Sequence, residues 1–304
     1  MSGDPVSLSI AVCTRNRPGD LADCVRSILG NPGDFDLIVI DQSDTPVALD
    51  NVTEFAADRR LRHLTSATRG LSRARNEAMA AAGTELLAFT DDDCRVSPRW
   101  VEGIRGLFER ESDLGLAYGR VIVPQELWQI GFTAGFEPAG EIRHRGRLPR
   151  PLEPWGIGAN MVVRRRTAVE LGGFDPFLGA GTSLHAGEEL DLALRMMGAG
   201  HTVAYTKTFE VTHLGVRPYA LARALYRNYD VGTGAAYAKN LRLGTPGVRG
   251  LFFRTLLLQL KAVLSALARG RRPHGLGQIV ATLTGATKGM LLKLNRGRHS
   301  FEDR

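Results

Sequence analysis

Three consecutive carboxylates that follow an apolar run are the residues with the clearest chemical potential in this chain. The run LLAFT, residues 86–90, leads directly into Asp91, Asp92 and Asp93. A short apolar run bounded by polar residues is typical of a buried strand. Adjacent carboxylates repel one another, so we expect a cation to offset the cost of grouping them. Mg²⁺ and Mn²⁺ take carboxylate oxygens together with substrate phosphates. The triplet therefore favours a metal–diphosphate site over a solvated acidic turn.

A second acidic group begins a stretch with helical spacing. Glu188 and Glu189 open this stretch, which continues to Ala199. The simplest interpretation is that two acids at a helix N-terminus interact favourably with the helix dipole. Asp191 and Arg195 are four residues apart, which predicts an ion pair on the surface of the same helix.

The elements that must position these acids alternate between strand and helix. Apolar runs predict strands over residues 8–13, 35–40, 61–64, 86–89, 116–123, 157–164, 202–205 and 209–212. Helical spacing predicts helices over residues 18–29, 71–82, 100–109, 167–171 and 188–199. This alternation favours parallel βαβ units.

Polar residues follow several of the predicted strands. Thr14 and Arg15 follow the first strand, Asp41 and Asp44 follow the second, and the acidic triplet at residues 91–93 follows the fourth. In open α/β sheets, ligands bind beyond the carboxyl ends of the strands. We therefore expect these side chains to line one crevice along one edge of the sheet.

The composition is that of an ordinary globular protein of 304 residues, with 43% hydrophobic and 23% charged residues. This length allows one large domain, or one domain with an appendage. Cys13, Cys24 and Cys94 have no CxxC spacing, which argues against a zinc site and a disulfide framework. No signal peptide is evident at the start. We expect reduced thiols and a cytoplasmic location.

The last part of the chain is strongly basic. Residues 241–304 contain 12 Lys and Arg against 2 Asp and Glu, whereas residues 1–240 carry a net charge of −3. We therefore divide the chain into a domain at 1–240 and a basic amphipathic helical tail at 241–304. Such asymmetry suggests a polyanionic partner.

Two apolar stretches in the tail, residues 250–268 and 276–294, contain interspersed basic residues. Arg254 and Lys261 would be costly near the centre of a spanning helix, so the first stretch predicts an interfacial helix, peripheral on the inner face of the plasma membrane. The alternative is a helix pair packed on the core or on a second subunit. Nucleic acid is not expected, because no recognised binding module accompanies the charge.

Seven segments together resemble the family 2 glycosyltransferases, which are inverting nucleotide-sugar enzymes of the GT-A fold. They are SIAVCTRNRP, LIVIDQSD, RGLSRARNEAMAAA, LLAFTDDDC, GANMVVRR, GGFDP and GEELDLALRMMGAGH, and they span about residues 8–213. The resemblance implies an α/β fold with a Rossmann-like, mostly parallel sheet and flanking helices. The tail would add a helical C-terminal extension.

The resemblance implies a nucleotide site on the first half of the chain. Thr14 and Arg15 would line the base pocket, and Asp41 would contact the base, with Asp44 as a less certain neighbour. Arg73 or Arg75 would approach the nucleotide or diphosphate, since a guanidinium matches phosphate oxygens. One of these two arginines would instead face solvent. The family suggests a UDP-sugar or a dTDP-sugar as donor.

The resemblance also implies a divalent metal, Mn²⁺ or Mg²⁺. Asp91 and Asp93 match the D-x-D pair of the family: Asp91 would hold the ribose and share in the metal site, and Asp93 would bind the metal. Asp92 would assist either. His213 matches a histidine that often completes the metal shell, although a lone histidine is also a common structural residue.

The implied catalytic base is Glu189, which stands where the family usually has an aspartate, so Glu188 is kept in reserve. A base is needed because the acceptor hydroxyl has a pKa far above neutral. One displacement at the anomeric carbon would then invert its configuration. The acceptor, which could be a glycan, a lipid-linked sugar or a small molecule, would lie near Trp155 and Asn160.

Two other functions fit parts of the pattern. A nucleotidyltransferase also joins βαβ units to acidic metal sites, but it would need a glycine- and Lys/Arg-rich loop after the first strand. The segment at residues 13–18 has the basic residues without the glycines. An inactive, glycosyltransferase-like scaffold on a membrane would need no intact acids, and both acidic groups are intact.

Overall fold

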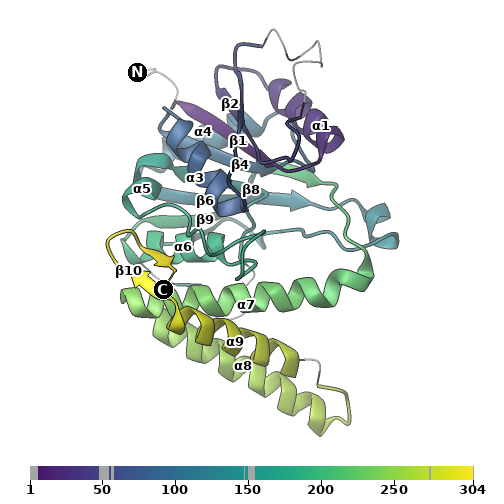
Figure 1. Ribbon diagram of the computed structural model, residues 1–304, viewed down its shortest axis with the longest axis vertical. Helices are drawn as coiled ribbons and strands as arrows, with labels where there is room; N and C mark the ends of the chain where they lie inside the picture. Colours follow the sequence, from purple (N-terminus) through teal and green to yellow (C-terminus); the bar gives the residue numbers. More distant parts are fainter. Residues whose placement is uncertain are drawn as a thin grey trace.

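The computed structural model describes residues 6–47, 55, 58–146, 148–149, 155–273 and 275–303. A central sheet with helices on both sides forms the first part of the chain (Figure 1). Three long helices follow it and lie against one side of this unit.

The sheet contains nine strands in the order β3-β2-β1-β4-β8-β6-β9-β5, and β7 pairs with β9. The strands are β1 (Leu8–Thr14), β2 (Asp36–Asp41), β3 (Leu61–Thr65), β4 (Leu86–Asp91), β5 (Cys94–Val96), β6 (Leu114–Ile122), β7 (Ile142–His144), β8 (Asn160–Arg164) and β9 (Thr202–His213). The first four strands along the chain pair in parallel, as predicted. β8 is antiparallel to both of its neighbours, so the sheet is mixed.

The parallel register brings the polar strand ends to one edge. Thr14 pairs with Asp41 at the end of β1 and β2, and Cys13 pairs with Asp91 at the end of β4. The apolar residues before these positions are buried, which fixes the strands and leaves their polar ends together. The predicted alignment of strand ends is therefore confirmed.

The helices of the first part are α1 (Pro18–Leu29), α3 (Leu71–Ala81), α4 (Trp100–Arg110), α5 (Arg165–Glu170) and α6 (Glu188–Gly198), with a short 3₁₀ helix η2 (Gln125–Gln129). The buried face of α1 consists of Leu21, Cys24, Val25 and Ile28, which is the face that the spacing predicted. The three cysteines are free thiols, as predicted.

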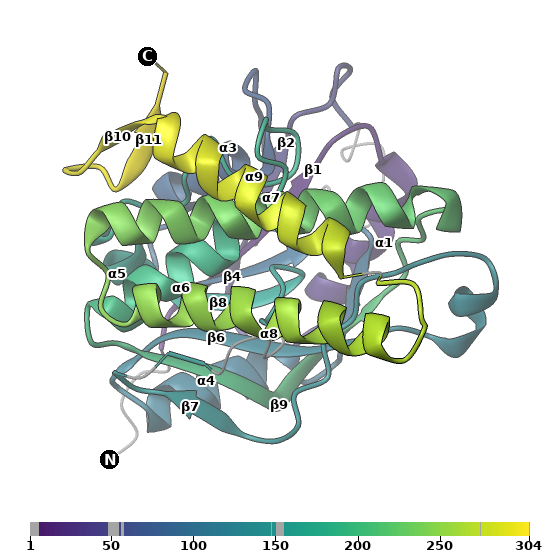
Figure 2. The ribbon, with the colours of Figure 1, turned by 90° about the horizontal axis from the view of Figure 1, so that it is seen from below.

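The last part of the chain contains α7 (Tyr219–Leu243), α8 (Val248–Ala268), α9 (Leu276–Leu291) and a hairpin of β10 (Lys293–Asn295) and β11 (Ser300–Glu302). Seen from below, these three helices lie in front of the sheet, and α8 and α9 are the outermost of them in Figure 1 (Figures 1 and 2). The predicted boundary at residue 240 falls inside α7, which continues across it without a break. The hairpin was not predicted, and β9 is one strand where two were expected.

Buried charges join α6 to α7. Asp191 of α6 accepts hydrogen bonds from Arg195 at 2.5 Å, Lys239 at 2.9 Å and Asn240 at 2.9 Å. Lys239 also pairs with Asp175 at 2.8 Å. Burial alone would raise the pKa of Asp191, but Arg195 and Lys239 lower it below its ordinary value. The predicted ion pair between Asp191 and Arg195 is confirmed, but its predicted position on the surface is wrong, because Asp191 is 0% exposed.

Candidate active site

The acids after β4 are balanced by an arginine from the segment after β1. Nη1 of Arg17 lies 3.0 Å from Oδ1 of Asp92 and 2.8 Å from Oδ2 of Asp93. Thr14 donates its hydroxyl to Oδ2 of Asp92 at 2.7 Å. Burial raises the pKa of Asp92 to about 6, even though Arg17 lowers it. The sequence analysis expected a cation here but gave Arg17 no role; its position after the first strand was the only available signal.

His213, the last residue of β9, completes this group of charges. Its Nε2 lies 3.2 Å from Oδ1 of Asp93, and its Nδ1 lies 2.7 Å from the carbonyl oxygen of Ala134. A carbonyl only accepts, so Nδ1 carries a hydrogen and Nε2 faces the carboxylate. Burial opposes both charges, yet the contact lowers the pKa of Asp93 and raises that of His213. A histidine fixed through one ring nitrogen is the usual arrangement of a metal ligand.

The side chains around Asp93 can hold a divalent ion. Ligand atoms of Asp93, Cys94 and His213 lie within 4.8 Å of one another. Burial raises the pKa of Cys94 well above its ordinary value, which keeps it as a thiol and leaves the oxygen and nitrogen donors. A Cβ at Gly215 would lie 2.0 Å from Oδ2 of Asp93, so the backbone approaches this carboxylate as only glycine allows. A carboxylate and an imidazole are both ligands that divalent metal ions accept.

Arg75, on α3, joins the two acidic groups that lie far apart in the sequence. Its Nη1 lies 3.3 Å from Oε1 of Glu188 and 3.1 Å from Oε1 of Glu189, and its Nη2 lies 3.8 Å from Oδ1 of Asp91. The side chain of Arg75 is only 2% exposed. In this structure the guanidinium of Arg75 holds three carboxylates, and its approach to the nucleotide or diphosphate stays a prediction.

Arg73 is the solvent-facing member of the arginine pair. Its Nη1 donates to the carbonyl oxygens of Arg69 and Pro176, at 3.2 and 3.3 Å. The sequence analysis expected one of the two arginines to face solvent, and the structure identifies it as Arg73.

The two glutamates at the start of α6 have different environments. Glu188 is 3% exposed, and burial, followed by the charge of Glu189, raises its pKa above the ordinary value. Its buried Oε2 has no hydrogen-bond partner in the described part of the chain. The side chain of Glu189 is 21% exposed, and its Oε1 accepts a hydrogen bond from the backbone N–H of Gly158 at 3.2 Å. Glu189 is thus the more accessible of the two carboxylates.

Asp41 shapes the loop after β2. Its Oδ1 accepts from the backbone N–H of Ser43 at 2.8 Å, and its Oδ2 accepts from that of Val47 at 2.7 Å and lies 3.1 Å from His63 Nε2. The side chain is 0% exposed. The carboxylate of Asp41 is thus used within the loop, and its predicted contact with the base stays a prediction.

The other predicted base-pocket residues lie at the same edge but differ in exposure. Thr14 is 4% exposed and its hydroxyl is committed to Asp92. Arg15 is half exposed and pairs with Asp44 at 3.4 Å, and Asp44 also accepts from Arg69 at 2.9 Å. The exposed group of Arg15, Asp44 and Arg69 is therefore the polar surface that this edge presents to solvent.

The predicted acceptor residues do not form one surface. Asn160 is 0% exposed. Its Oδ1 accepts from Trp100 Nε1 at 2.9 Å, and its Nδ2 donates to the carbonyls of Arg120 and Phe209 at 2.8 and 3.2 Å. This amide joins elements inside the core, and the acceptor contact of Asn160 stays a prediction. Trp155 is half-buried and packs against the core.

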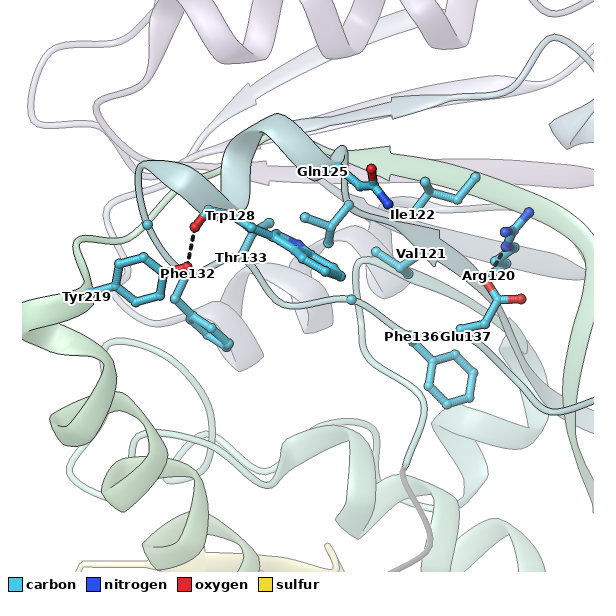
Figure 3. Close-up of a pocket in the computed structure, with 13 residues that line it drawn as sticks. Arg120, Val121, Ile122, Gln125, Trp128, Phe132, Thr133, Phe136, Glu137 and Tyr219 are labelled. Carbon is cyan, nitrogen blue, oxygen red and sulfur yellow. Dashed lines mark hydrogen bonds and ion pairs between the residues drawn. The ribbon is translucent and has the colours of Figure 1, made fainter.

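An aromatic-lined cavity of about 580 Å³ lies beside the acidic group, and the sequence analysis missed it. Trp128 of η2, Phe132 and Tyr219 at the start of α7 surround one end of it (Figure 3). Thr133 lines this cavity and donates its hydroxyl to the carbonyl of Gly215 at 2.9 Å. Since Gly215 contacts Asp93, the segment around Thr133 forms a wall shared by the cavity and the acids.

The sequence profile of Glycosyl transferase family 2 matches residues 9–172, which is more than half of the chain. The chain therefore belongs to glycosyl transferase family 2. Membership of this family favours the glycosyltransferase interpretation over the nucleotidyltransferase alternative.

Curated relatives carry glycosyltransferase names. The chain is 28% identical over 214 residues to the pre-mycofactocin glycosyltransferase of Mycobacterium tuberculosis, covering 68% of this chain and 42% of that protein. It is 24% identical over 240 residues to the glucosyl-dolichyl phosphate glucuronosyltransferase of Haloferax volcanii, covering 68% of this chain and 69% of that protein. The chain thus spans less than half of the length of the mycobacterial relative.

Among solved structures, the chain resembles the mannosyltransferase PcManGT of Pyrobaculum calidifontis, in complex with GDP-Man and Mn²⁺. The TM-score is 0.60 at 15% identity, covering 94% of this chain and 88% of the other. This similarity confirms the predicted fold: the protein has the GT-A architecture with a mostly parallel sheet, flanking helices and C-terminal helices.

Proposed function

We propose that the protein transfers a sugar from a nucleotide-diphosphate-sugar to an acceptor hydroxyl by a single, inverting displacement. The observation that carries this proposal is the convergence of two acidic groups, around Asp93 and Glu189, on one site. They are 96 residues apart in the sequence, and Arg75 contacts both groups through Asp91 and the two glutamates. Acids that serve a metal and an acid that serves as base are the two requirements of this chemistry.

Asp93 and His213 are the residues that we propose to hold a divalent ion, Mn²⁺ or Mg²⁺. Nε2 of His213 and Oδ1 of Asp93 are 3.2 Å apart. In a neutral imidazole whose Nδ1–H faces the Ala134 carbonyl, Nε2 has a free lone pair with which to bind a metal. When bound, the ion would offset the negative charge that develops on the departing diphosphate. Asp91, whose side chain is 36% exposed, is suited to accept hydroxyl hydrogens from the donor.

Glu189 is the proposed general base. It is more exposed than Glu188, and its Oε1 is fixed by Arg75 and by the Gly158 N–H. Glu189 takes the proton from the acceptor hydroxyl while the oxygen attacks the anomeric carbon opposite the diphosphate. The bond between that carbon and the diphosphate oxygen breaks, and the configuration inverts.

The environment of Glu188 supports the assignment of Glu189 as the general base. Burial raises the pKa of Glu188, which favours its neutral acid form. Two ionised carboxylates on one guanidinium would repel one another. Arg75 is a positioning residue in this proposal, because it reaches the acids and has almost no exposed surface.

The cavity beside Asp93 is the proposed site for an apolar part of the acceptor. Its volume of about 580 Å³ lies within the usual range of ligand pockets. Aromatic rings such as Trp128 and Phe132 can stack on a sugar face or on an apolar group. The names of the relatives give glucosyl-dolichyl phosphate in one case and pre-mycofactocin in the other. We propose an acceptor of one of these two kinds.

On the family resemblance, the donor is proposed to be a UDP-sugar or a dTDP-sugar. The complex of PcManGT with GDP-Man makes a GDP-sugar the third kind of donor to test. The experiment measures release of nucleoside diphosphate from a panel of these nucleotide-sugars, with Mn²⁺ and with a chelator. The proposal expects turnover of at least one donor, dependent on the metal, and its loss in Asp93→Asn. The absence of metal-dependent turnover or binding across the panel would contradict it.

A further inference from the structure

Helices α8 and α9 both expose large apolar side chains, and the set of these side chains is here called the α8–α9 face. Each of its residues is between 45% and 57% exposed. They are Phe253, Leu257, Leu260, Leu264 and Leu267 on α8, and Leu276, Val280, Leu283 and Met290 on α9. These two helices are the outermost elements below the sheet in Figure 1, and both lie in front in Figure 2.

The exposed residues of α8 follow the pitch of the helix. Their spacing of four, three, four and three residues places them on one side. A different set, including Leu251, Phe252 and Val263, is buried on the inner side. Arg254 and Lys261, seven residues apart, flank the exposed stripe. The helix is therefore apolar on two sides, and the protein covers only one of them.

The distribution of apolar side chains on α9 is the reverse of that on a surface helix of a water-soluble protein. Its inner face is made of small residues, such as Gly285 and Gly289, and its large residues point outward. A Cβ at Gly285 would lie 1.8 Å from the carbonyl oxygen of Val231 on α7, so the two backbones touch. Small residues between helices and large residues outside are typical of helices whose surroundings are lipid.

The charge of this region indicates which partner could cover the α8–α9 face. Between residues 241 and 301 the sequence contains no Asp or Glu, and Arg269, Arg271 and Arg272 are exposed at the end of α8. A second copy docked on the same face would bring two strongly positive surfaces together. An anionic lipid surface would complement the charge and cover the apolar stripe at once.

We propose that the α8–α9 face binds an anionic membrane surface, with both helices lying in the plane of the interface. α8 is long and apolar enough to cross a membrane by length and composition alone. Arg254 and Lys261 near its middle and its packed inner face favour the interfacial position. The proposal does not depend on sugar transfer, since it rests on a surface made only by the C-terminal helices.

Co-sedimentation of the full chain with vesicles tests the proposal. We expect strong binding to vesicles that contain phosphatidylglycerol, weak binding to pure phosphatidylcholine, and weaker binding as salt rises. Leu257→Asp combined with Leu264→Asp should reduce partitioning by about tenfold or more, since each leucine loses its burial in lipid. Arg271→Gln combined with Arg272→Gln should reduce it by about 30-fold on anionic vesicles only.

Matched controls lie on α5, away from this face. Val169→Asp replaces an apolar residue that is 49% exposed, and Arg166→Gln removes a charge that is 91% exposed, and neither should change partitioning. Circular dichroism melting establishes that each variant is folded. Equal binding to neutral vesicles, no binding of the full chain, or equal losses in the α5 controls would overturn the proposal. A lipid-free dimer that Leu257→Asp dissociates, or resistance to alkaline carbonate extraction, would overturn it in favour of self-association or a spanning helix.

Discussion

Lys239 of α7 and Asp191 of α6 form an ion pair of 2.9 Å in which neither side chain has any exposed surface. The pair ties the C-terminal helices to the helix that begins with Glu188 and Glu189. Lys239 also reaches Asp175, so its single charge is shared by two buried carboxylates. The long helix α7 is therefore built into the core that supports the acids.

Replacing this lysine should be costly. Lys239→Met leaves Asp175 and Asp191 buried without their common partner, and breaking a buried pair in this way destabilises a protein by about 3–5 kcal/mol. Urea denaturation of the variant should show that loss in the free energy of unfolding. Lys261→Met, an exposed position on α8, is the control and should change stability by less than about 0.5 kcal/mol. Equal stabilities of the two variants would contradict the anchoring role.

Two arginines on the same helix should differ sharply in their effect on turnover. Arg75→Met removes the guanidinium that holds Glu188, Glu189 and Asp91, so we expect about 100-fold lower kcat from misplacement of the acids. Arg73→Met should stay within about twofold of the parent protein, because in the described residues the hydrogen bonds of Arg73 go to the backbone carbonyls of Arg69 and Pro176. Steady-state kinetics with a donor identified by the panel above measures both. Similar kinetics for the two variants would remove the positioning role from Arg75.

A single methyl group should disturb the proposed metal site. In Gly215→Ala the new Cβ would lie 2.0 Å from Oδ2 of Asp93, so the carboxylate must move. Displacing a fixed ligand should weaken Mn²⁺ affinity by about 10- to 100-fold, as measured by calorimetry. Gly140→Ala is the control, because nothing lies within 4 Å of its Cβ position. Unchanged Mn²⁺ affinity in Gly215→Ala would argue against Asp93 as the ligand.

The aromatic cavity predicts a separation of acceptor from donor effects. Trp128→Ala removes a ring that is 59% exposed and lines the cavity. We expect the KM for the acceptor to rise by about three- to tenfold, which is the effect of losing one stacking contact, while the KM for the donor stays unchanged. Ile130→Ala removes a neighbouring apolar side chain, 66% exposed, that is not among the residues lining the cavity. A parallel change in donor KM would show that Trp128 acts elsewhere.

The sequence predicted most strands of the sheet and the edge where the acids gather, because local periodicity and strand ends determine them, but it missed the short strands β5 and β7. Asp93 and His213 were expected at one site and lie 3.2 Å apart, because β5, which begins just after Asp93, pairs with β9 and places Cys94 opposite His213. The role of Arg17 was missed because its charge meets Asp92 and Asp93 across 75 and 76 positions of sequence. Nothing local distinguishes such an arginine from a surface one.

Burial was the other property that the sequence pattern could not predict. Asp191 and Arg195 have the spacing of a surface pair, but α7 covers them with Lys239. Asn160 was expected near an acceptor because of the segment that contains it, whereas its amide is used by Trp100 and two strand carbonyls. In both cases the burial and the hydrogen-bond partners of a polar side chain depend on an element that is distant in sequence and packs over it. Local sequence does not contain this tertiary contact.

The proposed mechanism gives Glu189 and the metal-binding residues separate roles, the first in proton transfer and the second in donor binding. The most direct measurement compares Glu189→Gln with the parent protein in two assays: Mn²⁺-dependent binding of the donor by calorimetry, and turnover of that donor with acceptor. We predict unchanged binding and a turnover reduced by about 10²- to 10⁴-fold, because the amide cannot take the acceptor proton. Full turnover by Glu189→Gln, with binding intact, would contradict the proposed mechanism.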